Sequence, residues 1–155
     1  MKQLTPDQLQ RPELSEYKAA EKMPVCIVLD NVRSGLNVGA IFRTCDAFSV
    51  ESIYLCGITV HPPHAEILKT ALGATESVTW KSLPDTMNAI DELLASGYSI
   101  LPVEQTDHAV NLDQINLTEL FPIALIFGNE MRGVDPEILK RCLQSIEIPQ
   151  DGIKH

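Results

Sequence analysis

From Pro24 to the end of the chain, short apolar runs alternate with segments of helical pattern, and this alternation constrains the fold more than any other feature. The apolar runs suit strands that are covered on both faces. They are Val25–Leu29, Ser52–Cys56, Ser99–Val103, Ile123–Phe127 and Ser145–Ile148. Helices are predicted between them, over Leu36–Phe48, Ala65–Leu72, Leu83–Ser96 and Pro136–Cys142. Strands that alternate with helices imply a parallel sheet with helices on both faces, so the predicted class is α/β.

Capping residues define the ends of two of these helices. Ser82 and Asp85 predict a start similar to a capping box for the third helix, and Gly97 follows its end. Asp135 and Pro136 give the last helix an N-cap and a proline at its first position. These signals support the helical assignment where the apolar pattern alone is weak.

The chain of 155 residues has room for a single domain over residues 1–155, with residues 1–22 as an N-terminal helical extension. In that extension, Thr5 and Pro6 predict the start of a first short helix, and Pro12 that of a second through about Lys22. No run of eighteen apolar residues predicts a membrane helix. The polar amino terminus has no secretory pattern. Four cysteines without a CxxC pair are expected to be reduced and mostly buried in a cytoplasmic protein.

The net charge of −9 argues against a protein that holds nucleic acid by its overall charge. A local basic patch is still compatible with this total. Arg11, Lys18, Lys22 and Arg33 either form such a patch beside a site or are ordinary surface charges, which is the commoner role of these residue types.

Unusual residues follow three of the predicted strands, where ligands bind in open α/β sheets. After the first strand, Arg43 shares a helix face with three very small residues, Gly39, Ala40 and Ala47. This face suggests close packing against another surface with the guanidinium in a polar pocket, although a solvated arginine is the alternative. The turn after the third strand, LPVEQTDH, is by itself most compatible with an ordinary loop.

The last of these three strand ends is that of the predicted strand Ile123–Phe127, which is followed by Gly128, Asn129 and Glu130, and then by Arg132. Gly128 permits close approach of the backbone to a ligand. Glu130 and Arg132 place opposite charges where a site would form, although a tight polar turn with an exposed ion pair explains them equally well.

Several common ligand sites find no support. The first strand is not followed by GxGxxG, and no Walker A sequence is present. His61 and His64 flank two prolines and predict a rigid turn, so no metal site is expected.

Three segments together resemble the SpoU/TrmH branch of the SPOUT methyltransferase superfamily. NVGAIFRTCDAF (Asn37–Phe48) resembles the first family motif, LIFGNEMRGV (Leu125–Val134) the second, and IEIPQDG (Ile146–Gly152) the opening of the third. PPHAEILKTALGA (Pro62–Ala74) is also similar to family members. The resemblance implies a trefoil-knotted α/β fold, S-adenosylmethionine as cofactor, an RNA substrate and a homodimer whose active site draws residues from both subunits.

The resemblance also assigns roles by position. It implies methyl transfer to a ribose 2′-hydroxyl of transfer or ribosomal RNA, with Arg43, Asn37 and Glu130 as catalytic residues. The cofactor-binding positions that it implies are Glu104, Gln105, Thr106, Gly128, Asn129 and Ile148. We assign Arg33 and Arg132 to RNA binding.

The sequence departs from the family at its end. The third motif of the family continues into a serine-leucine-asparagine run and a final helix, whereas this sequence ends at Lys154 and His155. We therefore expect the tail that completes the knot to be missing. Two alternatives stay open, a noncatalytic SPOUT-like dimer that binds RNA or cofactor, and a small nucleotide-binding protein of the flavodoxin type.

Overall fold

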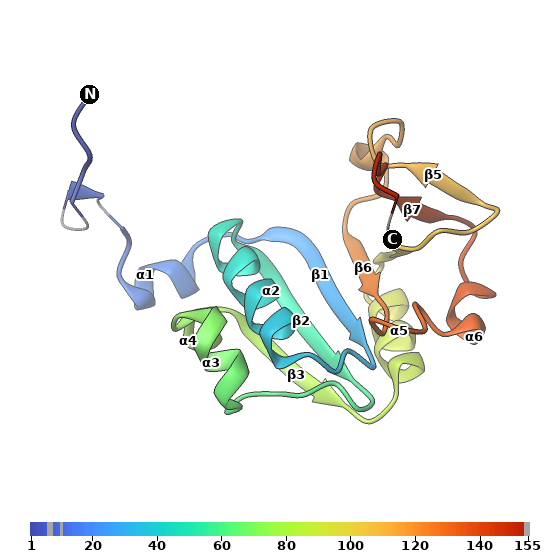
Figure 1. The fold of residues 1–155 in the computed structure, drawn as a ribbon, viewed down its shortest axis with the longest axis horizontal. Coiled ribbons are helices and arrows are strands. Elements are labelled where there is room, and N and C mark those ends of the chain that lie inside the picture. The colour runs from blue at the N-terminus through green and yellow to red at the C-terminus, as the bar shows by residue number, and fades with distance from the viewer. Residues whose placement is uncertain (6–7, 10, 154–155) are drawn as a thin grey trace.

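The computed structural model describes residues 1–5, 8–9 and 11–153. A parallel sheet with the strand order β3-β2-β1-β6-β4 lies at its centre (Figure 1). Its strands are β1 (Met23–Asp30), β2 (Val50–Cys56), β3 (Thr79–Leu83), β4 (Ser99–Pro102) and β6 (Ile123–Phe127). A second parallel sheet of two strands, β5 (Ala109–Asn111) and β7 (Ser145–Glu147), lies beside the end of β4.

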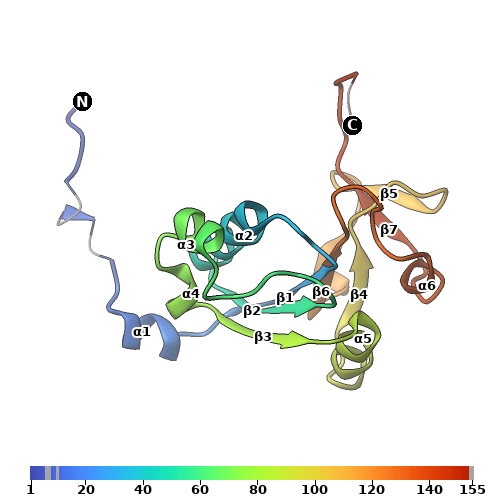
Figure 2. The same cartoon turned by 60° about the horizontal axis from the view of Figure 1, so that its bottom comes forward.

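Helices cover both faces of the central sheet, as the alternating pattern predicted (Figure 2). One face carries α2 (Gly35–Ala47), α3 (Ala65–Ala71) and α4 (Ala74–Ser77), and the other carries α5 (Thr86–Ala95) and α6 (Pro136–Leu139). Two further helical elements among the described residues are α1 (Leu14–Ala19) near the amino terminus and the 3-10 helix η2 (Leu117–Glu119). No helix in the described ranges combines the length and the apolarity that a membrane crossing requires.

The apolar strands have two buried faces because their side chains alternate between two cores. In β1, Ile27 and Leu29 belong to the core under α2, whereas Cys26 and Val28 belong to the core under α5. Phe42 of α2 is fully buried and makes an edge-to-face contact with Trp80. This packing fixes α2 on the sheet, and its first turn therefore lies at the carboxyl end of β1.

The structure corrects three of the predicted elements. β3 was not predicted, and Ser82 lies in it, so the expected helix Leu83–Ser96 begins only at Thr86. Its N-cap is Asp85, which accepts from the backbone N–H of Met87 at 2.9 Å, and the predicted capping pair of Ser82 and Asp85 is wrong. The last predicted strand pairs with β5 outside the central sheet, and the helix before it ends at Leu139.

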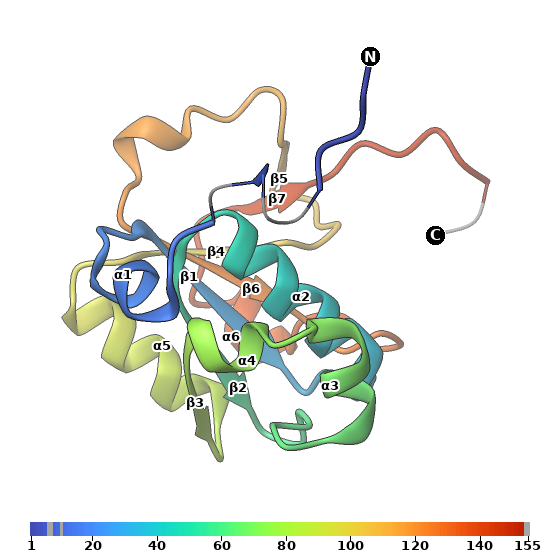
Figure 3. The same cartoon turned by 90° about the vertical axis from the view of Figure 1, so that its left-hand side faces the viewer.

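The N-terminal extension contains the second of its two predicted helices, α1, which ends at Ala19. The first was predicted on Pro6, which lies outside the described residues. The Tyr17 hydroxyl donates to the backbone oxygen of Asp46 at 2.8 Å, which ties α1 to the last turn of α2. Figure 3, viewed from the side of the molecule that carries α1, shows α1 to the left of α2.

Candidate active site

The carboxyl ends of β1, β6 and β4 lie at one edge of the central sheet, since these strands are parallel neighbours. The segments that follow them are residues 31–34, 128–135 and 103–108. They include most of the site positions that the sequence singled out. A ligand site in an open α/β sheet is expected at such an edge.

Glu130 joins the second of these segments to the start of α2. Its Oε1 accepts from the backbone N–H of Ser34 at 2.9 Å and from Nδ2 of Asn37 at 3.2 Å. Its Oε2 accepts from the backbone N–H of Arg33 at 3.1 Å. A carboxylate at this end of a helix is favoured by the helix dipole as well as by the bonds themselves.

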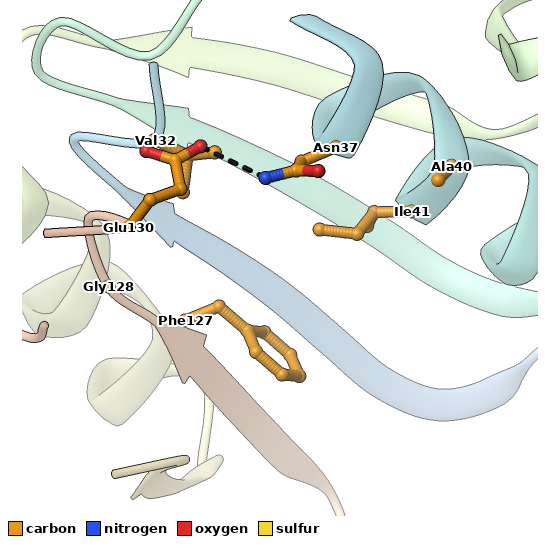
Figure 4. Close-up of a pocket in the computed structure, with 7 residues that line it drawn as sticks. All are labelled: Val32, Asn37, Ala40, Ile41, Phe127, Gly128 and Glu130. Carbon is orange, nitrogen blue, oxygen red and sulfur yellow. Dashed lines mark hydrogen bonds between the residues drawn. The ribbon is translucent and has the colours of Figure 1, made fainter. Parts of the chain in front are cut away.

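The surroundings of Glu130 keep it ionised. Partial burial raises the pKa of its carboxyl, but hydrogen bonds from the backbone of Ser34 and Arg33 and from the Asn37 amide outweigh burial and hold the pKa below the usual 4.5. An ionised carboxylate only accepts hydrogen bonds, so the amide of Asn37 turns its nitrogen toward Glu130. Its oxygen points away from the carboxylate (Figure 4).

Asn37 and Glu130 form the polar side of a pocket of about 320 Å³. Phe127 and Ile41 supply apolar walls to the same pocket (Figure 4). The other lining residues are Val32, Ala40 and Gly128. A pocket of this kind, mostly apolar with a fixed pair of polar groups, is typical of small-molecule sites.

A second pocket of about 230 Å³ lies where the segment after β4 meets β7. The backbone N–H of Glu104 donates to the oxygen of Ile146 at 3.0 Å and joins the two segments. The pocket is lined by Val103, Glu104, Gln105, Ile146, Glu147, Ile148 and Gln150. It therefore brings together three of the predicted cofactor positions, Glu104, Gln105 and Ile148. Thr106 lies outside it and bonds to Ser145.

Gly128 makes its close approach to the protein's own backbone rather than to open space. A Cβ added to Gly128 would lie 2.1 Å from the carbonyl carbon of Gly133 and 2.1 Å from the nitrogen of Val134. The backbone N–H and C=O of Asn129 bond to Gly133 at 2.9 and 2.8 Å. Tight folding of the loop on itself thus requires a glycine here, while the contact of Gly128 with a ligand stays a prediction, since Gly128 also lines the first pocket.

Arg43 does not meet Asn37 and Glu130 within one chain. It lies six residues after Asn37, about 9 Å along the axis of α2 and on a different side of it. The exposed side chain lines a separate pocket of about 810 Å³, whose other walls include Arg11 and Tyr17 of the N-terminal extension and Asp46 of α2. No hydrogen bond or ion pair joins the Arg43 side chain to the part of the chain that the structure describes.

The face of small residues around Arg43 is divided in the structure. Gly39 is buried against α3, where an added Cβ would lie 2.1 Å from Oγ1 of Thr70 and 2.5 Å from the backbone oxygen of Ile67. Ala40, Arg43 and Ala47 are exposed. The close packing inferred for this face is thus made by Gly39 within the chain.

Arg33 and Arg132 are exposed on the two segments that Glu130 joins, so both flank the first pocket. The possible N-terminal patch is divided, because β1 separates Arg33 from Lys22 by about 26 Å at the rise of a strand. The Lys22 ammonium lies 3.3 Å from the centre of the Tyr17 ring. Ordinary surface charge is the better description of Lys22, whereas Arg11 lines the same pocket as Arg43.

The segment with His61 and His64 forms a turn before α3, as predicted. His61 stacks on Trp80 with the ring centres 6.4 Å apart. Within the described residues, no three side chains of metal-binding type are grouped.

Three residues of the site were not singled out from the sequence. Asp30 ends β1 and Asn31 follows it, and both bond to the segment 128–135. The hydroxyl of Ser34 caps α2 by accepting from the backbone N–H of Asn37 at 3.2 Å. Ser34 could have been found, because a serine three residues before Asn37 at the start of an apolar helix is an N-cap signal.

The fold is that of an α/β protein with pockets at the carboxyl edge of its parallel sheet, where ligands bind in this class. The model of the SpoU rRNA Methylase family matches residues 24–155. The chain therefore belongs to this family, and the resemblance of its motifs is confirmed.

Relatives and solved structures agree with this assignment. The chain is 31% identical over 146 residues to a tRNA (guanosine(18)-2′-O)-methyltransferase of Aquifex aeolicus, a match that covers 90% of this chain and 65% of that protein. The AdoMet-bound rRNA methyltransferase of Sinorhizobium meliloti has a TM-score of 0.79 at 26% identity, over 87% of this chain and 51% of that one. A TrmH/SpoU tRNA-modifying enzyme of A. aeolicus has a TM-score of 0.74 at 26% identity, over 90% and 70%. The chain spans 65% or less of the curated relatives named first, down to 25% for a mitochondrial rRNA methyltransferase of Dictyostelium discoideum.

Proposed function

We propose that the protein transfers a methyl group from S-adenosylmethionine to a ribose 2′-hydroxyl of transfer or ribosomal RNA, as a cytoplasmic homodimer with a knotted cofactor site. The observation that carries the proposal is the bond between Asn37 and Glu130, which fixes a polar pair at the wall of a pocket. It is supported by the tRNA 2′-O-methyltransferase among the relatives and by the AdoMet-bound structure from S. meliloti.

The pocket beside β7 fits the cofactor in its chemistry. Val103, Ile146 and Ile148 offer apolar contact for an aromatic ring. The carboxylates of Glu104 and Glu147 accept bonds from neutral donors and have no ion-pair partner among the described side chains, so the pocket suits a positively charged ligand. When bound, S-adenosylmethionine supplies a methyl group that is already activated for displacement.

Asn37 is suited to hold the substrate hydroxyl. Glu130 fixes the nitrogen of the Asn37 amide, which leaves the amide oxygen as an acceptor for the ribose O–H. Negative charge develops on the ribose oxygen as its proton passes to solvent, ahead of the new bond to the incoming methyl group. Asn37 and Glu130 therefore position the nucleophile and do not need to be strong bases.

Arg43 would stabilise the developing negative charge. Arginine keeps its proton in proteins, so its role is electrostatic, and its planar group can hold an adjacent RNA phosphate at the same time. Its exposed position on α2, away from Glu130, requires that Arg43 act on the site of a second subunit. Arg33 and Arg132 flank the pocket and would bind RNA phosphates locally, which lets a protein of net charge −9 hold RNA.

A second candidate is a dimer of the same fold that binds RNA or cofactor without catalysis. Arg43 and Glu130 lie in separate pockets of one chain, and this separation favours the second candidate. A dimer that does not bring Arg43 of one subunit to Glu130 of the other would leave these two residues apart. Methyl transfer to RNA separates the two candidates.

The test uses the purified protein with tritium-labelled S-adenosylmethionine and total RNA from a strain in which the gene is deleted. We expect label in RNA, and digestion to nucleosides with mass spectrometry to find it as a 2′-O-methyl nucleoside. Label on a base would contradict the ribose assignment. Cofactor binding without label in any RNA would favour the noncatalytic candidate.

A further inference from the structure

Two segments far apart in the sequence, the end of β1 with the start of α2 and the loop after β6, are joined by several hydrogen bonds. Asp30 accepts from the backbone N–H of Asp135 at 3.1 Å, and the backbone oxygen of Asn31 accepts from Nδ2 of Asn129 at 2.8 Å. The bonds from the start of α2 to Glu130 continue the series. The loop that carries Glu130 is therefore fastened to the end of β1 on both sides of Glu130.

Asn129 has little capacity left for a ligand. Its Oδ1 accepts from the backbone N–H groups of Met131 and Arg132 at 3.0 and 3.2 Å, and one Nδ2 hydrogen is used by Asn31. Its backbone N–H and C=O both bond to Gly133. One side-chain N–H alone has no partner within the described residues. Its bonds thus serve the shape of the loop.

Asn31 is held in place as firmly as Asn129. Its backbone has φ = 58°, in the left-handed region that asparagine tolerates better than most residues. Its Oδ1 accepts from the backbone N–H of Ile58 at 3.1 Å, and its Nδ2 donates to Asp30 at 2.9 Å. The carbonyl that receives Asn129 is therefore fixed by the ends of two strands.

Asp30 is a buried carboxylate that bonds to the same two segments and to α5. It is 2% exposed, and its Oδ1 also accepts from the Thr86 hydroxyl at 2.6 Å. All of its bonds come from neutral donors of three segments: Asn31, Thr86 of α5, and Asp135 ahead of α6. A buried carboxylate with this many partners resists movement of any of them.

We propose that Asn31 and Asn129 are positioning residues that hold the Glu130 carboxylate against the first turn of α2. This inference rests on the proposed function and gives Asn129 a role other than the cofactor contact expected from the family resemblance. Glu130 follows Asn129 directly, so a shift of the loop away from Asn31 lengthens all three bonds of the carboxylate. Asn31 and Asn129 act through Glu130 and Asn37 and do not touch the substrate.

The test replaces Asn129 with serine. A serine hydroxyl can still accept from the N–H two residues on, as in other turns of this kind, but it is too short to reach the carbonyl of Asn31. The matched control is Asn116→Ser at the N-cap of η2, because Asn116 likewise accepts from the N–H two residues on and also donates its amide, in its case to the side chain of Glu119. The pKa of Glu130 is read from its carboxyl carbon by NMR, with Glu130→Gln used to assign the signal.

For Asn129→Ser we expect the pKa of Glu130 to rise toward that of an ordinary glutamate. The methylation rate should fall about 10-fold, as expected when a bond that orders a charged group is lost. The Kd for S-adenosylmethionine should change less than twofold, and Asn116→Ser should change none of the three. An unchanged Glu130 pKa would overturn the proposal, and so would a loss of cofactor affinity equal to the loss of rate.

Asn31→Gly provides a second variant if Asn129→Ser does not fold. Glycine accepts the left-handed φ but removes the bonds to Ile58 and Asp30, so the pKa and the rate should move in the same direction by a smaller amount. An unchanged Glu130 pKa in this variant would also count against the proposal. If the pKa moves as expected while the wild-type protein methylates no RNA, the proposed function fails and the positioning role stands.

Discussion

The side-chain amide of Asn37 donates to Oε1 of Glu130 at 3.2 Å, across 93 residues of sequence. The bond sets the direction of the amide, because the carboxylate can only accept. It also joins the first turn of α2 to the loop after β6. One polar contact thus links the two motifs on which the proposed chemistry depends.

Replacement of Glu130 with glutamine should lower the methylation rate. The glutamine amide keeps one acceptor but turns N–H groups toward donors that the carboxylate had satisfied, at a cost of about 1–3 kcal/mol, or roughly 5-fold to 150-fold in rate. Single-turnover rates with saturating cofactor measure the effect. Glu119→Gln is the control, since Glu119 also accepts from an asparagine amide, in η2. An equal loss in both variants would argue against a specific role for Glu130.

The contribution of Glu130 to stability should depend on pH. Its pKa is lower in the folded protein than the usual 4.5, so its bonds stabilise the fold above about pH 4.5 and lose this effect as the pH falls through the lower folded pKa. The difference in unfolding free energy between wild type and Glu130→Gln should therefore shrink on acidification. Urea unfolding at pH 6 and at pH 4 or below measures it. A difference that grows toward low pH would contradict the assignment.

Replacement of Arg43 with lysine should abolish most of the methylation while the Kd for S-adenosylmethionine barely changes. Lysine keeps the charge but cannot hold an oxyanion and a phosphate with one planar group. A tritium-methyl assay and titration calorimetry give the two quantities. Arg141→Lys is a suitable control, because Arg141 is a surface arginine that follows α6 and pairs with Asp91 of α5 at 2.7 Å. Equal loss of rate and affinity in Arg43→Lys would count against its role in the transition state.

The cysteines should differ in reactivity. Burial raises the pKa of Cys45 and of Cys56 to about 12. At pH 8 roughly one molecule in 10⁴ then carries either thiolate, and thiolates are the reactive form. Cys142 is only partly buried, so iodoacetamide should modify it first in the native protein. Peptide mass spectrometry over time tests this order, and early modification of Cys45 would contradict the packing of α2.

Burial explains which strands could be predicted from the sequence. β1 and β6 lie between two cores, and their nearly continuous apolar runs predicted both. β3 is an edge strand whose sequence, TWKSL, mixes polar and apolar residues and is only partly buried, so it gave no such run. β5 has three residues and pairs with β7 in the second sheet. The residues of β5 and β7 contain no local pattern that identifies each strand as the partner of the other.

Part of the candidate site could be predicted from the sequence, as could part of the fold. The motifs identified Asn37 and Glu130, and the structure brings them together, while their catalytic roles and that of Arg43 stay predictions. The position of Arg43 relative to Glu130 depends on how two chains pack, which no local pattern contains. The sequence predicted a close approach of the Gly128 backbone to a ligand, which stays a prediction, and only the folded loop shows the close approach to the backbone of Gly133.

Gly133 offers a test of how strictly this loop must be shaped. Its φ is +69°, and an added Cβ would lie 2.2 Å from Oε2 of Glu104, the atom that accepts from the backbone N–H of Val134 at 2.9 Å. Gly133→Ala therefore adds backbone strain and also displaces the carboxylate that holds the loop. Gly97→Ala is the matched control, because φ is +84° there and an added Cβ meets nothing within 4 Å.

Both variants should lose about 1–2 kcal/mol of unfolding free energy from the strained backbone, with Gly133→Ala at the upper end or beyond. Only Gly133→Ala should also weaken cofactor binding, by about 10-fold, because Glu104 links the loop after β6 to the pocket beside β7 and loses a charge-assisted bond. Urea unfolding and titration calorimetry separate the two effects. Equal cofactor affinity in Gly133→Ala and Gly97→Ala would mean that the pocket beside β7 does not depend on this loop, and the cofactor would then have to bind elsewhere.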